Sequence, residues 1–224
     1  MFISRIHLDP RRRGTKQAMA NPNHFHAHVQ KVLSQGPGTP VDGRGRPLWR
    51  LERAGGFPTL YVVSKTRPDL SLTQSQYGSP DAPPEYHDYT RRLDAIERGQ
   101  IWSFRLVANP THNISRKKDG KIIRTPHRVV KFQSEWLGYQ GDRNGFSILG
   151  EPVISSLATS TFSRREEGPK GPKVTVASCI FAGRLEVTDP DKFRKALMLG
   201  VGRARAYGCG LLTVAPVQVE ATNK

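Results

Sequence analysis

Only two cysteines occur in the 224 residues, Cys179 and Cys209, and no Cys-x-x-Cys motif joins them. We therefore expect neither a zinc ribbon nor a disulfide framework, and the expected compartment is a reducing cytoplasm. Long apolar runs are also missing. The longest, Cys179–Ala182 and Leu211–Val217, are strand-sized and far shorter than the ~18 residues of a membrane helix. An integral membrane protein is not expected, and the N-terminus lacks the features of a secretory signal.

Acidic residues are scarce as well, with 19 Asp and Glu against 35 Lys and Arg and a net charge of +16. Such a surplus needs counter-charges, and nucleic acid is the commonest partner of so basic a protein. A membrane surface is the second alternative, but the basic amphipathic helix or lipidation motif that it needs is absent from the sequence. The third is a protein whose basic charge serves solubility alone.

Periodic patterns predict a series of strands and helices. The expected strands are residues 2–8, 48–52, 59–63, 101–107, 146–149, 174–187 and 211–215. Asn21-Pro22 and Thr125-Pro126 are typical helix starts, and Thr188–Asp191 is expected to start a third helix. Between residues 66 and 99 we expect one short helix, a weak strand and a linker.

The predicted elements follow the order β-α-β-β-α-β in the second half of the chain and, less sharply, in the first half. This is the ferredoxin-like pattern twice. We therefore predict an α+β fold of tandem ferredoxin-like (RRM-like) domains, with residues 1–97 in the N-terminal domain and residues 98–224 in the C-terminal domain. Sheets of this type can present an open face to single-stranded RNA.

A glycine-rich segment near the C-terminus has two Gly-x-Gly pairs that bracket two arginines and a tyrosine: Gly200, Gly202, Arg203, Arg205, Tyr207, Gly208 and Gly210. Glycines let the backbone approach a ligand closely, and exposed N–H groups bind phosphate oxygens. The segment is not a Walker loop, because no Gly-Lys-Ser/Thr follows. It is a poor dinucleotide fingerprint, because it follows a helix and precedes a strand. A tight turn at a helix end is the alternative, but the arginines favour contact with phosphate.

Residues 200–216, GVGRARAYGCGLLTVAP, resemble the C-terminal signature of the CasE family, the CRISPR RNA-processing endoribonucleases of the type I-E Cascade system. Further matches follow in order along the chain, at residues 20–22, 104–110, 125–137 and 181–187. Val107 stands where the family often has Arg. The resemblance covers the whole chain and implies the tandem ferredoxin-like fold.

The same resemblance implies a metal-independent cleavage of RNA, with no cofactor, that leaves a 2′,3′-cyclic phosphate and a 5′-hydroxyl. Its implied partners are the CRISPR repeat RNA stem-loop and the other Cascade subunits, with no membrane.

Three of the seven histidines, His24, His26 and His28, fall in the first turns of the first predicted helix. At ~100° per residue, the apolar stripe that starts at Phe25 puts His26 on one half-buried flank with Asn23, and the other two histidines on the opposite flank. A zinc site at His24 and His28 lacks an evident third ligand. From the residues alone, solvated histidines and a catalytic histidine both remain open.

The resemblance places His26 at the family's catalytic position. RNA supplies the 2′-OH nucleophile, and a histidine can accept its proton or protonate the departing 5′-oxygen. Family members can carry a Tyr three residues earlier, where this chain has Asn23. An amide is not an acid, so Asn23 has at most an orienting role. Either His26 works largely alone, or His24, His28 or a distant group shares the proton transfer. The alternative function is a non-catalytic RNA-binding subunit.

Basic residues are concentrated in several short segments. Residues 111–143 hold eight Lys and Arg against three acids. Residues 163–173 surround a Gly-Pro-rich tip of a predicted hairpin, which in the family grips the major groove of the repeat stem-loop. Singly each residue is as well explained as a solvated charge, but together they match a phosphate-binding footprint. The candidate RNA-binding residues are Arg11, Arg12, Arg13, Lys117, Lys118, Lys121, Arg128, Arg164, Arg165, Lys170, Lys173, Gly200, Gly202, Arg203, Arg205, Gly208 and Gly210.

Overall fold

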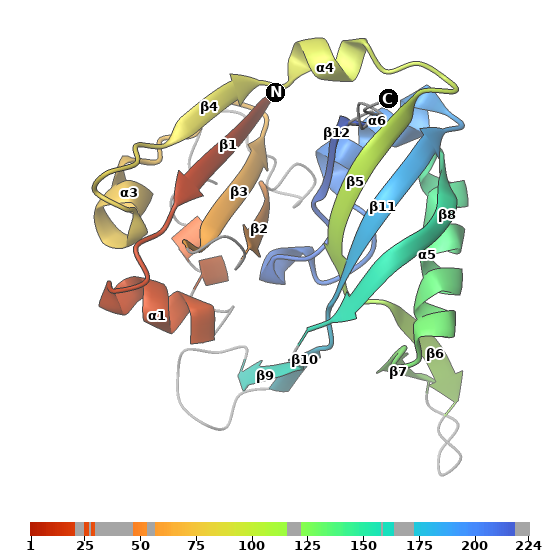
Figure 1. The fold of residues 1–224 in the computed structure, drawn as a ribbon. Helices are drawn as coiled ribbons and strands as arrows, with labels where there is room; N and C mark the ends of the chain where they lie inside the picture. The colour runs from red at the N-terminus through yellow and green to blue at the C-terminus, as the bar shows by residue number, and fades with distance from the viewer. Residues whose placement is uncertain are drawn as a thin grey trace, which may run out of the picture.

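The computed structural model describes residues 1–20, 25, 26, 28, 29, 47–52, 57–115, 122–157, 159–163 and 173–217. Among these residues, two four-stranded antiparallel sheets make up most of the fold (Figure 1). The first sheet contains β1 (Phe2–His7), β2 (Leu48–Glu52), β3 (Thr59–Ser64) and β4 (Glu85–Asp88). It is accompanied by the helices α1 (Arg13–Ala20), α3 (Ser71–Tyr77) and α4 (Thr90–Asp94).

The second sheet lies in the C-terminal half of the chain. Its strands are β5 (Ile101–Ala108), β8 (Phe146–Ser156), β11 (Cys179–Val187) and β12 (Leu212–Pro216). The helices of this half are α5 (Val130–Asn144), α6 (Pro190–Leu199) and the 3-10 helix η1 (Arg205–Tyr207). Two strand pairs extend from it, β6 (Thr111–Ser115) with β7 (Ile122–Pro126), and β9 (Ser160–Ser163) with β10 (Lys173–Val176).

The two sheets have the same topology. The strand orders are β4-β1-β3-β2 and β12-β5-β11-β8, so the fourth strand of each half pairs with the first, the first with the third, and the third with the second. This is the ferredoxin-like arrangement in both halves. The predicted α+β fold of tandem ferredoxin-like domains is confirmed, whereas the boundary between residues 97 and 98 stays a prediction.

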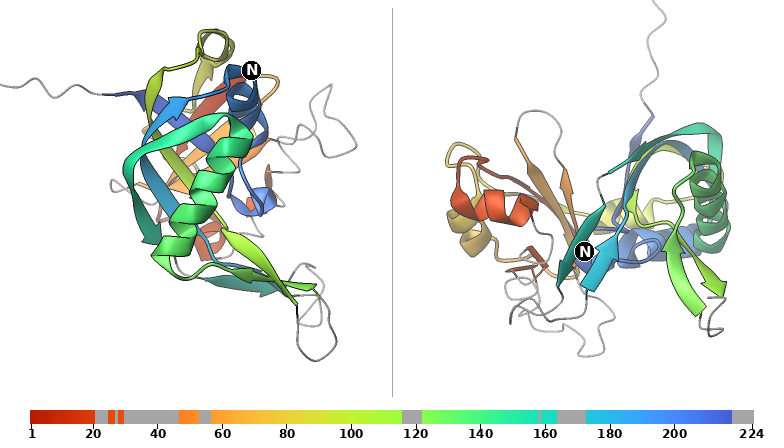
Figure 2. Two further views of the ribbon diagram at one scale, coloured as in Figure 1. Left: turned by 90° about the vertical axis from the view of Figure 1, so that its right-hand side faces the viewer. Right: turned by 90° about the horizontal axis from the view of Figure 1, so that it is seen from below.

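The helices α1, α3 and α5 lie on the outside of the molecule. Seen from below, α1 and α3 flank one side of the molecule and α5 the other, with the two sheets between them (Figure 2). On the helix side of the first sheet, Ile6 of β1 and Leu8, which directly follows β1, are fully buried. In the second half, Phe193 and Leu197 of α6 and Leu137 of α5 are fully buried in one core. Burying apolar side chains in this way supplies the main stabilisation of each half.

Arg50 of β2 joins the two sheets. Its side chain is only 2% exposed, and its Nη1 donates to the carbonyl oxygens of Leu211, at 2.9 Å, and Arg105, at 3.2 Å. Its Nη2 donates to Thr213 Oγ1 at 2.9 Å and pairs with Glu52 at 2.7 Å. Burial lowers the pKa of Arg50 from its ordinary value. The guanidinium thus fixes the edge of the first sheet against β5 and β12 of the second.

Several predicted elements are corrected by the structure. Thr125-Pro126 does not start a helix, because Pro126 pairs with Thr111 in the β6–β7 ladder and α5 begins only at Val130. Val129 and Val130 do not face the core either: they are 56% and 57% exposed. The apolar spacing of this segment predicts an inward stripe of Val129, Val130, Gln133, Trp136 and Leu137. That stripe begins one turn too early, because the buried face of α5 starts at Gln133.

The basic segment after β1 is also different from the prediction. The run of basic residues after the first strand, Arg11, Arg12, Arg13 and Lys16, predicts a loop. Arg13 and Lys16 lie in α1 instead, so only the residues before Arg13 form the loop. The expected long strand 174–187 is divided into β10 and β11 by Ala177 and Ser178. The region 66–99 contains the predicted short helix and weak strand, together with a second short helix, α4. The helix start at Asn21-Pro22 lies outside the described residues.

The other predicted elements are confirmed. Strands occur at β1, β2, β3, β5 and β12 close to the predicted ranges, and β8 begins at the predicted residue but extends to Ser156 rather than ending at 149. The third predicted helix is α6, with Pro190 in its first turn and Asp189 as its N-cap, whose carboxylate accepts the Lys192 N–H at 3.1 Å. No described helix is both long and apolar enough to cross a membrane.

The buried arginine generates the first prediction. Arg50→Met keeps most of the side-chain volume but removes the Nη1 donor of the Leu211 and Arg105 carbonyls and the Nη2 partner of Thr213 and Glu52. We expect the free energy of unfolding to fall by about 3 kcal/mol, the scale of a broken buried charge contact. Urea unfolding measures this, with Arg98→Ala as the exposed control, expected within about 0.5 kcal/mol of the parent. Equal stability of the two variants would contradict the role given to Arg50.

Candidate functional site

His26 is positioned by the buried residue that precedes it. Phe25 is fully buried, and its ring packs against Trp49 at 5.3 Å and Tyr77 at 5.4 Å between centroids. Because Phe25 faces the core in a helical turn, the next residue lies about 100° further round. His26 is accordingly half-buried, as the helical pattern predicts.

The ring of His26 meets the glycine-rich segment. Its centroid lies 5.5 Å from that of Tyr207, with the two rings edge to face. Tyr207 ends η1 and is itself half-buried. The structure therefore brings together two segments that are about 180 positions apart in the printed sequence, and it does so at the one histidine that the family resemblance selects.

His28 has a different environment. It is buried, its Nε2 lies 2.9 Å from Thr73 Oγ1, and its ring contacts Tyr77 at 4.6 Å. This places His28 in the packing between its helical turn and α3. Asn23 and His24 lie outside the described residues. Within the described part of the chain, no group of three His, Cys, Asp or Glu side chains is arranged to hold a metal ion.

Positive φ angles and close packing shape the glycine-rich segment. Gly208 has φ +80°, and a Cβ there would lie 2.8 Å from Cζ3 of Trp49. The loop is closed by two backbone bonds, Val201 N–H to Gly210 O at 2.8 Å and Gly210 N–H to Val107 O at 2.7 Å. Glycine is thus required at position 208 both for conformation and for the approach of the Trp49 ring.

The two arginines of this segment have different environments. Arg205 donates from Nε to Gly202 O at 3.0 Å and from Nη1 to Leu199 O at 2.7 Å, so its guanidinium braces the loop from within. Arg203 is exposed on the loop surface. Contact of either residue, or of the four glycines, with RNA stays a prediction.

A small cavity lies beside Tyr207. It has a volume of about 360 Å³, and its wall includes Met19, Trp49, Gly208 and Cys209. Burial raises the pKa of the Cys209 thiol to about 12, so this residue is a neutral, apolar part of the wall. The cavity lies where α1, β2 and the glycine-rich segment meet, next to the ring that contacts His26.

The predicted basic residues are placed only in part. Arg11 forms an ion pair with Asp9 at 3.0 Å, and this bond holds the pKa of the Asp9 carboxyl below its usual value. Arg12 donates to the carbonyl oxygen of Ser75, whereas Arg13 and Arg128 are exposed. Lys173 lies in β10, and the predicted hairpin strands on both sides of the basic tip are confirmed. The residues that lie outside the described ranges are Lys117, Lys118, Lys121, Arg164, Arg165 and Lys170.

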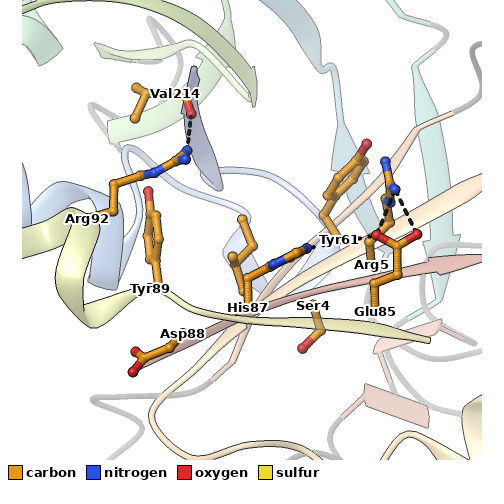
Figure 3. Close-up of a pocket in the computed structure, with 10 residues that line it drawn as sticks. Ser4, Arg5, Tyr61, Glu85, His87, Asp88, Tyr89, Arg92 and Val214 are labelled. Carbon is orange, nitrogen blue, oxygen red and sulfur yellow. Dashed lines mark hydrogen bonds and ion pairs between the residues drawn. The ribbon is translucent and has the colours of Figure 1, made fainter. Parts of the chain in front are cut away.

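A second cavity, of about 450 Å³, lies between the two sheets (Figure 3). In it the Arg5 guanidinium faces Glu85 and donates to both carboxylate oxygens at 2.7 Å, which lowers the pKa of Glu85. Arg92 is directed to the carbonyl oxygen of Val214 at 3.4 Å. Because Arg5 is paired with an acid, this cavity offers less uncompensated positive charge than the surface around the glycine-rich segment.

A third depression was not foreseen from the sequence. It is an open groove of about 530 Å³ between α5 and the β6–β7 pair, and one end is formed by Gly202 and Arg203. The rings of His112 and His127 stack within it at 4.4 Å. Burial and the neighbouring His112 lower the pKa of His127, so its ring is mainly neutral at pH 7. The signal in the sequence was weak, because the two histidines are brought together only by the ladder that pairs β6 with β7.

Known proteins that are similar to this chain in sequence also share its architecture. The model of a family described as "CRISPR associated protein" matches residues 1–216. CRISPR-associated endoribonuclease Cse3 of Thermus thermophilus is 33% identical over 224 residues, covering 96% of this chain and 100% of the relative.

Solved structures agree with these matches. Thermus thermophilus Cse3 bound to an RNA representing a pre-cleavage complex has a TM-score of 0.75 and 31% identity, covering 96% of this chain and 98% of that chain. Cas6e from Escherichia coli K-12 has a TM-score of 0.66 and 19% identity, covering 97% and 100%, and shares the fold. With the family model spanning nearly the whole sequence, the chain belongs to the CasE (Cse3) family of CRISPR-associated proteins.

Proposed function

We propose that the protein is a metal-independent endoribonuclease that cuts CRISPR precursor RNA at the repeat stem-loop. The observation that carries this proposal is the contact of His26 with Tyr207 of the glycine-rich segment, which sets a candidate proton-transfer group beside a candidate phosphate-binding loop. The net charge of +16 suits a polyanionic substrate. The relative at 33% identity is named an endoribonuclease, which supports the same activity here.

The proposed chemistry uses the RNA's own nucleophile. The 2′-OH before the scissile phosphate attacks the phosphorus, the bond to the departing 5′-oxygen breaks, and the products are a 2′,3′-cyclic phosphate and a 5′-hydroxyl. One group must take the 2′-OH proton and another must deliver a proton to the 5′-oxygen. A histidine is suited to either step near neutral pH.

Charge on the reacting phosphate also has to be stabilised. A nearby guanidinium is suited to a phosphate that gains negative charge. The N–H groups of Gly200, Gly208 and Gly210 already donate to backbone carbonyls, so the loop offers its arginine rather than these amides. Arg203, exposed on the same loop as Tyr207, is the described arginine that we assign to this task. The scheme routes no step through a metal ion.

Tyr207 is the residue that we propose to position His26. Asn23 stands where family members can carry a Tyr, and the structure puts another tyrosine ring against the histidine. A ring held edge to face restricts the imidazole to one orientation. The phenol of Tyr207 also offers a proton, which the amide of Asn23 does not.

We further propose that the protein remains bound to its product as a subunit of Cascade. Chains in structures of the CRISPR RNA-guided surveillance complex share the fold, at 20% and 22% identity. The alternative is a non-catalytic RNA-binding subunit, for which the loss of the family tyrosine is the supporting observation. Cleavage of a repeat RNA by the purified protein distinguishes the two.

His26 is the residue whose replacement tests the mechanism. His26→Ala should slow single-turnover cleavage by ~10²–10⁴-fold, the usual contribution of a histidine acid or base. RNA affinity should change little, because no large basic contact is removed. His28→Gln is the matched control: it removes a buried imidazole that contacts Thr73, so it is expected to lower stability rather than the rate of the folded fraction.

Tyr207→Phe refines that measurement, because it keeps the ring contact with His26 and removes only the phenol. A normal rate assigns Tyr207 to positioning alone, and a loss comparable to that of His26→Ala assigns it a proton. Normal cleavage by His26→Ala would show that the active site lies elsewhere.

The hairpin β9–β10 generates a binding prediction. We propose that Arg164 and Arg165, beyond the end of β9, grip the stem of the RNA. Arg164→Ala combined with Arg165→Ala should weaken binding of the repeat stem-loop more than binding of an unstructured RNA of equal length, and should reduce the salt dependence of affinity by about two phosphate contacts. Fluorescence anisotropy at several salt concentrations measures both effects. Equal losses on the two RNAs would remove the assignment of the hairpin to the groove.

A further inference from the structure

We propose that the groove between α5 and the β6–β7 pair binds the single-stranded RNA that flanks the stem-loop. The inference rests on the proposed function, because it needs an RNA that is held near His26. It adds a second binding site, which is distinct from the cavity beside Tyr207 and from the basic hairpin.

The groove has the size and the openness that a strand of nucleotides requires. Its volume of about 530 Å³ falls within the ~300–1,000 Å³ of ordinary ligand pockets. Its lining includes Asn109, just after β5, residues of β6 and α5, and the loop residues Gly202 and Arg203. An extended ligand can therefore enter at the glycine-rich segment and continue between α5 and β6.

Flat rings line this groove. His112 is exposed and stacks on His127, with centroids 4.4 Å apart and ring planes at 30°. Phe132 lies 6.0 Å from His127 and is 46% exposed, and Tyr139 is 56% exposed on the same helix. Exposed aromatic faces are costly to leave in water and are the usual platforms for unpaired bases. A base pair inside a duplex has no free face for them, so the rings favour single-stranded RNA.

The charges of the groove suit a phosphate backbone. Arg124, Arg143 and Arg203 line it, against one acid, Glu135. Arg143 donates to the hydroxyl of Tyr139 at 2.9 Å and lies over its ring, so arginine and tyrosine form one surface of positive charge and flat ring. This combination of a cationic groove with stacking rings is typical of single-strand binding.

The lining of the groove includes a buried acceptor. Asn109 is only 9% exposed, and no described residue donates to its Oδ1. A buried acceptor without a donor costs free energy unless a ligand or water supplies one. The exocyclic amino group of a base is a donor of the right kind.

The glycine-rich segment connects the groove to the proposed active site. Gly202 packs so closely on Trp136 of α5 that a Cβ there would lie 2.9 Å from Cζ2 of the indole. The same segment carries Tyr207, which contacts His26. The loop therefore contacts the candidate catalytic histidine through Tyr207 and lines the groove through Gly202 and Arg203. We infer that RNA continues from the cut site past Arg203 into the groove.

Matched RNAs and matched variants test this inference. The probes are the repeat stem-loop with blunt ends and the same stem-loop with a short single-stranded extension on its 5′ or its 3′ side. The groove variant is His112→Ala with Phe132→Ala. The control variant is His87→Ala with Phe57→Ala, which also removes an exposed histidine and an exposed phenylalanine.

We expect one of the extensions to raise the affinity of the parent protein about 10-fold, the scale of one stacked base. The groove variant should lose this gain while it binds the blunt stem-loop as the parent does, and the control variant should keep the gain. A 4-thiouridine in the extension should form photo-crosslinks to α5 or β6 in the unaltered protein, a readout that does not depend on the folding of any variant.

The inference is wrong if the parent binds the blunt stem-loop and neither extension adds affinity, or if crosslinks form only outside the groove. It is also wrong if the groove variant loses co-purifying Cascade subunits with no change in RNA binding, which would make the groove a protein-docking surface. If the parent binds no stem-loop at all, the proposed function fails and this inference fails with it.

Discussion

The buried guanidinium of Arg50 is the contact on which the arrangement of the two halves depends. A charge that is only 2% exposed is tolerated when it is paired and hydrogen-bonded, and here Nη1 and Nη2 are taken by Leu211, Arg105, Thr213 and Glu52. Three of these four partners belong to the other half of the chain. Any shift of one sheet against the other would break hydrogen bonds of this guanidinium. The relative position of the two halves is therefore fixed by hydrogen bonds as well as by apolar contacts.

The neighbouring residue on β2 extends this constraint to the functional site. Successive strand residues point to opposite faces, so Trp49 is directed away from the partners of Arg50. Trp49 is buried between Phe25 on one side and Gly208 on the other. The same ring therefore holds the turn that carries His26 and the loop that carries Tyr207. His26 and Tyr207 are brought together by two consecutive residues of β2. These residues are Trp49 and Arg50, and each of them contacts both halves of the molecule.

The fold was predictable because its signals are local. Alternating apolar residues predicted the strands, and Asp189-Pro190 predicted the start of α6, and the structure contains these elements. Thr125-Pro126 led to a wrong prediction of a helix start. Proline is accepted both in the first turn of a helix and at the end of a strand, and here it ends β7 with its pairing to Thr111 intact. The half-buried position of His26 was predictable from helical periodicity. Its contact with Tyr207 and the stacking of His112 on His127 were not, since both depend on long-range packing that no local pattern records.

The central claim is that the RNA's own 2′-hydroxyl is the nucleophile and that protein side chains move the protons. The most direct test compares two repeat stem-loops, all-ribose and with a single 2′-deoxy sugar before the scissile phosphate, in excess EDTA. The account predicts equal binding of both, cleavage of the all-ribose RNA to a 2′,3′-cyclic phosphate, and no cleavage of the deoxy RNA. Cleavage of the deoxy RNA at the normal rate, or loss of all cleavage in EDTA with recovery on addition of magnesium, would contradict it.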